Sequence, residues 1–322
     1  MLLIRKLFPA VVAPVAALLL SVSALAADYP SRPIEIVVPS SAGGGTDVMA
    51  RIFTEVAKKY VSQPMVVSDK PGASGGIGMT EVQRSAPDGY KIGVLISELA
   101  IIPHLGMTKA TVSDFIPIAR LNADPGVVAV RADAPWQSIE ELLAQARKEP
   151  RSITMGNAGT GSIWHLAAAA VEEKSDVRFN HVPFQGAAPS VLALVGGHVN
   201  AITVSPAEIG SFVAAGKVRV LVALSERRLP APFDKVMTFK EKGVDLVVGT
   251  WRGLGAPLGT PPEVVSYLRE ATRKTAEEPA FREALSKANL QPAYMDGETF
   301  QTFMNSQSSY FKSLLNRLNL QN

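Results

Sequence analysis

Two glycine-rich loops carry the residues whose types and spacing best suit a binding function in this 322-residue chain. The first, SSAGGGTDVMARIF at 40–53, places three glycines between an apolar run and an amphipathic helical pattern. The second, NAGTGSIWHLAAAA at 157–170, repeats that plan with added hydroxyl groups and a histidine. The first N–H groups of a helix lack intrahelical partners, and glycine lets a ligand approach them closely. Both loops therefore predict an anion-binding site.

The first loop does not match the common nucleotide-binding motifs. A phosphate-binding P-loop needs a lysine, and residues 39–57 contain none. The dinucleotide fingerprint would need a third glycine where Val48 stands. We expect Thr46 to cap the helix, and Asp47 falls in the first turn, where its charge suits the helix dipole.

A third motif, GASGG at 72–76, matches the G-x-S-x-G pattern of serine hydrolases, with Ser74 at its centre. A nucleophile elbow follows a strand directly, whereas Pro71-Gly72 is typical of a turn. We therefore favour a connecting loop. An exported serine hydrolase that uses Ser74 and one of the four histidines remains an alternative.

The histidines do not predict a metal site. His104, His165, His181 and His198 show no ligand spacing, and the chain has no cysteine. We therefore expect neither a metal nor a cofactor. His165 falls in the first turn of its helix. It is either a neutral side chain, packed on Trp164 or bonded to a carbonyl, or a hydrogen-bond donor that points into a cleft.

Further polar residues follow predicted strands. In open α/β sheets, ligands bind outside the carboxyl ends of the strands. The segments concerned are VPFQGAAPS with Gln185 and Gly186, ITVSPAE with Ser205, and VGTWRGLGAP with Trp251 and Arg252. A guanidinium pairs bidentately with a carboxylate, so Arg252 is a candidate ligand contact, with a surface ion pair as the alternative. For Trp251 the alternative is packing in the core or at a hinge.

Short apolar runs, the last at Leu246–Gly249, alternate with nine helical patterns between Thr46 and Leu318. This alternation predicts an α/β fold with mostly parallel sheets. The two glycine loops repeat one strand–loop–helix plan about 115 residues apart. This repetition predicts two lobes, each of which places one helix N-terminus at the binding site.

The N-terminus predicts export. Arg5 and Lys6 precede an apolar run, and Ala24-Leu25-Ala26 is a typical cleavage site, so we expect a signal peptide at 1–26 that is cleaved after Ala26. Its removal leaves 30 basic and 29 acidic residues, a balance that does not indicate nucleic-acid binding. The absence of cysteine excludes a disulfide scaffold, a cysteine nucleophile and a lipobox-type lipid anchor.

Six ordered segments resemble the Bug family, the extracytoplasmic solute-binding subunits of tripartite tricarboxylate transporters. They are YPSRPIEIVVPSSAGGGTDVMAR, VVSDKPGASGGIGMTEVQRSAPDGY, GTGSIWHLA, PFQGAAPSVLALVGGHVNA, AAGKVRVLVALSERR and WRGLGAPLGTPPEVV. The resemblance covers essentially the whole chain after the leader. It implies a periplasmic-binding-protein fold of type II, with two α/β lobes joined by two crossovers. Residues 28–127 and 250–322 would form lobe one, and 128–249 lobe two.

The resemblance also implies a function. The protein would be a periplasmic, monomeric, non-enzymatic receptor that closes on a small carboxylate and delivers it to membrane permease subunits. Backbone N–H groups of the loops would hold the carboxylate, together with side chains at their edges. The candidate ligand-binding residues are Ala42, Gly43, Gly44, Gly45, Thr46, Asp47, Glu98, Thr160, Gly161, Ser162, His165, Gln185, Gly186, Ala187, Ser205, Trp251 and Arg252. A ligand-sensing module that docks on a membrane sensor is an alternative role.

The ligand class is a narrower prediction. Members that bind amino acids need an acid facing the ligand ammonium, which we expect near 203–205. That loop reads Thr203-Val204-Ser205, so an amino-acid ligand is disfavoured. We expect a di- or tricarboxylate, with Arg252 at its distal carboxylate and Glu98 at the pocket rim.

Overall fold

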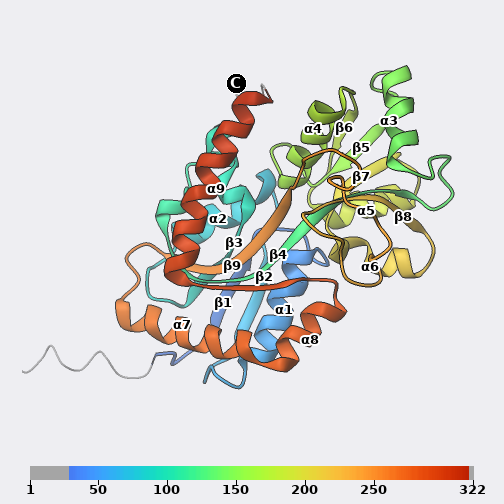
Figure 1. Cartoon of the computed structure of the whole chain (residues 1–322). Coiled ribbons are helices and arrows are strands. Elements are labelled where there is room, and N and C mark those ends of the chain that lie inside the picture. The colour runs from blue at the N-terminus through green and yellow to red at the C-terminus, as the bar shows by residue number, and fades with distance from the viewer. Residues whose placement is uncertain (1–28, 319–322) are drawn as a thin grey trace, which may run out of the picture.

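A computed structural model of the chain describes residues 29–318, and the predicted leader lies outside them. In this part of the chain, helices cover a ten-stranded sheet (Figure 1). The strands are β1 Ile34–Val38, β2 Met65–Asp69, β3 Lys91–Ile96, β4 Phe115–Arg131, β5 Thr154–Asn157, β6 Asn180–Pro183, β7 Ala201–Val204, β8 Val218–Leu224, β9 Gly249–Pro257 and β10 Pro292–Asp296. The α-helices are α1 Gly45–Ala57, α2 Gly76–Gln83, α3 Ile139–Lys148, α4 Ile163–Ser175, α5 Ala187–Val195, α6 Pro206–Ala214, α7 Pro262–Glu277, α8 Pro279–Lys287 and α9 Gly297–Arg317.

The sheet forms two lobes that share the long strand β4 (Figure 1). In the first lobe, β2, β1, β3 and β9 lie side by side next to the first part of β4, and β10 pairs with β4 as well. In the second lobe, β7 and β8 pair with the last part of β4, and β5 and β6 extend the sheet. The two-lobe α/β architecture predicted from the sequence is confirmed.

Strand directions are mixed. The strands pair in parallel among β1, β2 and β3 and again among β5, β6 and β7, as predicted. Pairings that involve β4 or β9 are antiparallel, so the prediction of mostly parallel sheets holds only for the outer strands. The reason is the path of the chain, which enters the second lobe along β4 and returns beside it along β9. Pro125 of β4 pairs with Gly249 of β9 at this crossing.

The crossing strand β9 was predicted at the wrong residues, and the strands β6 and β10 were not predicted. Of the run Leu246–Gly249, only Gly249 belongs to a strand, which continues instead through the glycine-rich residues that follow. Glycines normally weaken a strand and suggest a loop. Here they are required by packing, because a Cβ at Gly253 would lie 2.4 Å from the Phe300 ring and 2.5 Å from the Ala119 carbonyl oxygen.

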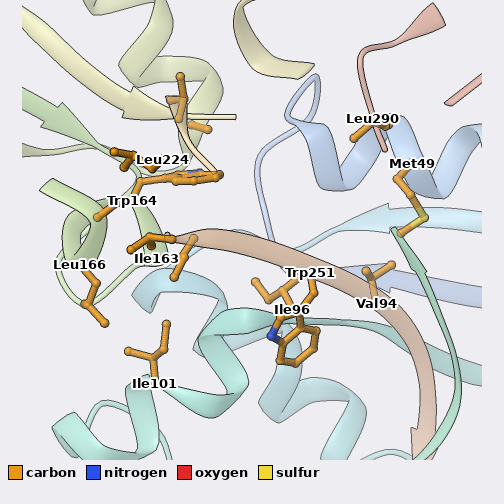
Figure 2. Packing of buried hydrophobic residues seen from close by; sticks show 14 of the residues in the cluster. Met49, Val94, Ile96, Ile101, Ile163, Trp164, Leu166, Leu224, Trp251 and Leu290 are labelled. Atoms are coloured by element: carbon orange, nitrogen blue, oxygen red, sulfur yellow. The ribbon is translucent and has the colours of Figure 1, made fainter. Parts of the chain in front are cut away.

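The apolar core runs through both lobes and around the crossing strands. Figure 2 shows side chains from both lobes beside β9, among them Ile96 and Trp251 from the first lobe and Trp164 and Leu224 from the second. Each of these four side chains is buried. Across residues 29–318, no helix combines the length and apolar character needed to cross a membrane.

Candidate ligand-binding site

A cavity of about 60 Å³ lies between the lobes. The first lobe contributes the loops before α1 and α2 and the end of β3, and the second contributes the starts of α4, α5 and α6. The lining residues include Ser40, Ser41, Gly44, Gly45, Thr46, Ser74, Glu98, Ser162, Ile163, Gln185, Gly186, Ala187, Glu208, Thr250 and Arg252. Several helix N-termini therefore meet at one small space.

The N-terminus of α1 is open toward the cavity. Its N-cap is Gly44, which provides no side-chain cap, and the N–H groups of Gly45, Thr46 and Asp47 have no partner among the described residues. The prediction that Thr46 caps this helix is wrong, because Thr46 lies inside it and its hydroxyl accepts a bond from Arg252 Nε at 3.0 Å. Asp47 does not line the cavity; its Oδ2 accepts from Gly43 N at 2.8 Å and fixes the loop.

The N-terminus of α5 is open in the same way. Its N-cap is Gly186, at φ 116°, a conformation that favours glycine. The N–H groups of Gln185, Gly186 and Ala187 have no partner in the described part of the chain. A Cβ at Gly186 would lie 2.5 Å from Ser41 Oγ, so this terminus lies against the α1 loop of the opposite lobe.

The N-terminus of α4, by contrast, is occupied by groups of the protein itself. Ser162 accepts a bond from His165 N at 3.2 Å and caps the helix. The N–H of Gly161 donates to His165 Nδ1 at 3.2 Å, and the N–H of Ile163 donates to Glu98 Oε1 at 3.1 Å. Glu98 follows β3, so this last bond joins the two lobes.

The N-terminus of α6 is likewise occupied. Both the N–H and the hydroxyl of Ser205 donate to Glu208 Oε2 at 2.6 Å, which is a capping box. Pro206, the first residue of the helix, has no N–H to offer a ligand. An acid thus lies at the cavity three residues beyond the 203–205 loop. The sequence argument against an amino-acid ligand overlooked this residue.

A buried ion-pair cluster forms one wall of the cavity. Arg252 donates to Asp124 Oδ2 at 2.5 Å through Nη1 and to Glu208 Oε1 at 3.3 Å through Nη2. Burial raises the pKa of Asp124, of Glu208 and of Glu98, while the nearby Arg252 charge acts in the opposite direction. Because it is paired with Asp124 and Glu208, the Arg252 guanidinium is largely neutralised by the protein. It is not the free counter-charge expected from the sequence.

Eight predicted residues lie outside the cavity lining. They are Ala42, Gly43, Asp47, Thr160, Gly161, His165, Ser205 and Trp251, whereas Gly44, Gly45, Thr46, Glu98, Ser162, Gln185, Gly186, Ala187 and Arg252 line it. His165 packs edge-on against His181, and burial lowers its pKa to about 4, which leaves it neutral. Trp251 packs against Phe300 and Phe303 because neighbouring strand residues face opposite sides of the sheet, and Arg252 takes the cavity side.

Five polar lining residues were not predicted as ligand contacts: Ser40, Ser41, Ser74, Glu208 and Thr250. The Oγ atoms of Ser40 and Ser41 are buried without a hydrogen-bond partner in the described residues. Their place beside the triple glycine was a usable signal, as was the S-x-x-E spacing from Ser205 to Glu208.

Ser74 is placed as a contact between the lobes. Its hydroxyl donates to the Thr160 carbonyl oxygen at 2.7 Å. A hydrolase nucleophile would instead bond to a general base. Within residues 29–318 there is also no group of three or more His, Cys, Asp or Glu side chains arranged to hold a metal ion.

Comparison with known proteins agrees with this geometry. Residues 49–320 match the family model described as "Tripartite tricarboxylate transporter family receptor". A UPF0065 protein from Cupriavidus necator is 34% identical over 91% of this chain and 89% of its own length. The crystal structure of a ligand-free TctC solute-binding protein from Polaromonas is 50% identical, with a TM-score of 0.67 over 90% of this chain and all of the other.

Three further solved structures superpose more closely on this chain than the Polaromonas protein does. The periplasmic binding protein BugD has a TM-score of 0.87 at 29% identity, over 91% of this chain and 99% of its own. A Rhodopseudomonas palustris protein with bound malate has a TM-score of 0.82 at 26% identity, over 89% of this chain and 100% of its own. An R. palustris protein with adipate has a TM-score of 0.86 at 25% identity, over 91% of this chain and 99% of its own. The chain therefore belongs to the tripartite tricarboxylate transporter receptor family of Bug-type solute-binding proteins.

Proposed function

We propose that this protein captures a small organic carboxylate between its lobes and delivers it to the membrane permease subunits of a tripartite tricarboxylate transporter. The observation that supports this best is the pair of open helix N-termini, α1 from one lobe and α5 from the other, at one cavity. Unpaired N–H groups at a helix start bind anions. Each bond to a carboxylate contributes about 1.5–3 kcal/mol, so four to six of them would support roughly micromolar affinity after association costs.

A compact dicarboxylate is the guest that we favour. Two open helix termini can take two carboxylates, and the buried Ser40 and Ser41 hydroxyls offer further donors. Structures of relatives contain malate and adipate, which are both dicarboxylates. A tricarboxylate is less favoured, because Arg252, the cation expected at a further carboxylate, is already paired with Asp124 and Glu208.

Closure of the lobes is the proposed mechanism. The bonds from Ser74 to Thr160 and from Ile163 to Glu98 join the lobes beside the cavity. The chain superposes better on the malate and adipate structures than on the ligand-free Polaromonas protein, although the latter is about twice as similar in sequence. We infer hinges where β4 and β9 cross, near the predicted lobe boundaries at 127/128 and 249/250. A ligand then stabilises the closed form by its greater affinity for that form.

This role needs no catalysis, metal or nucleic acid, and we propose a monomer that works in the periplasm. A thermal-shift screen of mono-, di- and tricarboxylates, with amino dicarboxylates included because of Glu208, tests the proposal. A ligand at about 100 times its Kd adds roughly 2.7 kcal/mol to stability. We expect at least one dicarboxylate to raise Tm and to compact the protein in small-angle scattering. Stabilisation by no carboxylate at millimolar concentration would contradict the proposal.

A further inference from the structure

Four α-helices of the described chain that begin at the cavity differ in what occupies their first N–H groups. The termini of α1 and α5 have glycine N-caps and open N–H groups. At α4, Glu98 accepts from the N–H of Ile163, the first helical residue, and at α6, Glu208 accepts from the N–H of the N-cap residue Ser205. The α6 contact is a local capping box, whereas the α4 contact comes from the other lobe.

A fifth helix, α2, also begins beside the cavity but satisfies its own N–H groups. Those of Gly75 and Ile77 donate to the Gly72 carbonyl oxygen, and that of Gly76 donates to Ala73 O. No carboxylate is needed there. The cavity thus has two open termini and two that carry a carboxyl group of the protein.

Helix α4 does not need Glu98 as a cap. Ser162 already provides the side-chain cap, and Gly161 N donates to His165. Glu98 is nonetheless 6% exposed, and it is held by Ile163 N at 3.1 Å and by the Ser97 hydroxyl at 3.1 Å. Burial of a carboxyl group is costly, and an apolar side chain would fill the same space without that cost. A role in the cavity explains its presence better than packing does.

We propose that Glu98 is a specificity-determining residue whose carboxyl group occupies the α4 terminus in place of a ligand carboxylate. Glu98 restricts the ligand's carboxylates to the open N-termini of α1 and α5, and its bond to Ile163 joins the lobes in the closed form. The statement about ligand specificity rests on the proposed function. The statement that Glu98 occupies the α4 terminus does not depend on that function.

Formate, the smallest carboxylate, tests the occupation directly. In Glu98→Ala, formate can enter the vacated space and bind Ile163 N, so formate should raise Tm by about 2–6 °C relative to sodium chloride at equal ionic strength. Glu98→Gln keeps the side chain in place and should not show this gain. Glu173→Ala, an exposed position near the end of the same helix, is the matched control. Equal formate shifts in wild type and all three variants would overturn the proposal.

A second measurement addresses specificity. Succinate and propane-1,2,3-tricarboxylate differ by one carboxymethyl group, so their Kd ratio reports on one additional carboxylate position. Glu98→Ala should shift this ratio toward the tricarboxylate by about tenfold, and an unchanged ratio would overturn the specificity claim. If neither compound binds any variant while formate still stabilises Glu98→Ala, the proposed function fails and the occupation of α4 stands.

If Glu98→Ala does not fold, the same bond is tested from its donor. Ile163 is the first residue of α4, where proline is tolerated, so Ile163→Pro removes the N–H. Ile163→Ala loses comparable packing and keeps the N–H. The proline variant should have a Tm about 3–6 °C below that of the alanine variant. Equal Tm values would show that the Glu98 contact has no stabilising effect and would overturn the proposal.

Discussion

Arg252 of β9 and Asp124 of β4 form a buried ion pair, with Nη1 and Oδ2 2.5 Å apart, where the chain crosses between the lobes. The same guanidinium reaches Thr46 in the first lobe and Glu208 in the second. One side chain therefore links the two crossing strands to a helix of each lobe. This arrangement makes Arg252 a structural link between the lobes at the strand crossing, in addition to a cavity wall.

Replacement of Arg252 by alanine should destabilise the protein by about 3–5 kcal/mol, because it leaves Asp124 and Glu208 buried without their cation. Urea denaturation followed by circular dichroism measures this change. Arg227→Ala, at an exposed position, serves as the control and should change stability by less than about 0.5 kcal/mol. A similarly small effect at Arg252 would show that the buried cluster tolerates the loss of its cation.

The stability effect of Glu98→Gln should depend on pH. Burial raises the pKa of Glu98 above its ordinary value of 4.5, so folding favours the protonated form. The stability that this group contributes is fully present below pH 4.5 and is lost as pH rises through the higher folded-state pKa. Glutamine imitates the protonated form at every pH. Relative to wild type, Glu98→Gln should therefore become more stable as pH rises from about 4.5 to 8.

Urea titrations of both proteins at several pH values within that range provide the measurement. A stability difference that stays constant with pH would contradict the raised pKa. The conclusion concerns Glu98 alone, because Asp124 and Glu208 titrate equally in both proteins.

The open terminus of α5 can be tested by removal of a single donor. Ala187 is the first residue of this helix, so Ala187→Pro deletes one cavity-facing N–H at a position where proline is tolerated. A hydrogen bond to a charged group is worth about 1.5–3 kcal/mol, so affinity for the carboxylate should fall roughly 10- to 100-fold. Ala187→Gly keeps the N–H and should bind more tightly than the proline variant. Isothermal titration calorimetry distinguishes the two, and equal affinities would exclude Ala187 N from the site.

The Ser74 contact predicts weaker closure without it. Ser74→Ala removes the bond to Thr160 and should weaken ligand affinity by about two- to tenfold. Ser74 has φ 50°, so Ser74→Gly loses the same hydroxyl without the backbone strain that alanine retains. Both variants should therefore bind more weakly than wild type, with alanine the less stable of the two. Ester hydrolysis by wild type that Ser74→Ala abolishes would instead support the hydrolase alternative.

The sequence predicted the helices well because their local signals are strong. The amphipathic pattern of α3, the proline at the start of α7 and the Ser162 cap of α4 are each readable within a few residues. The strand β9 was not readable in this way, since its glycines are explained by Phe300 and by β4, which lie far away in the chain.

The same distinction applies to the site. The triple glycine and the segment at 185–187 were identified from local composition, because an exposed helix start needs bare backbone. Sequence alone thus determined the two-lobe architecture, the family and the open terminus of α1. It placed the second anion-binding terminus at the loop before α4, whereas in the structure that terminus is occupied and α5 is open. Only the tertiary structure decided that Arg252 pairs with Asp124, that Trp251 faces the other side of β9 and that Glu98 binds α4. Those outcomes depend on contacts between distant segments, which local residue patterns do not encode.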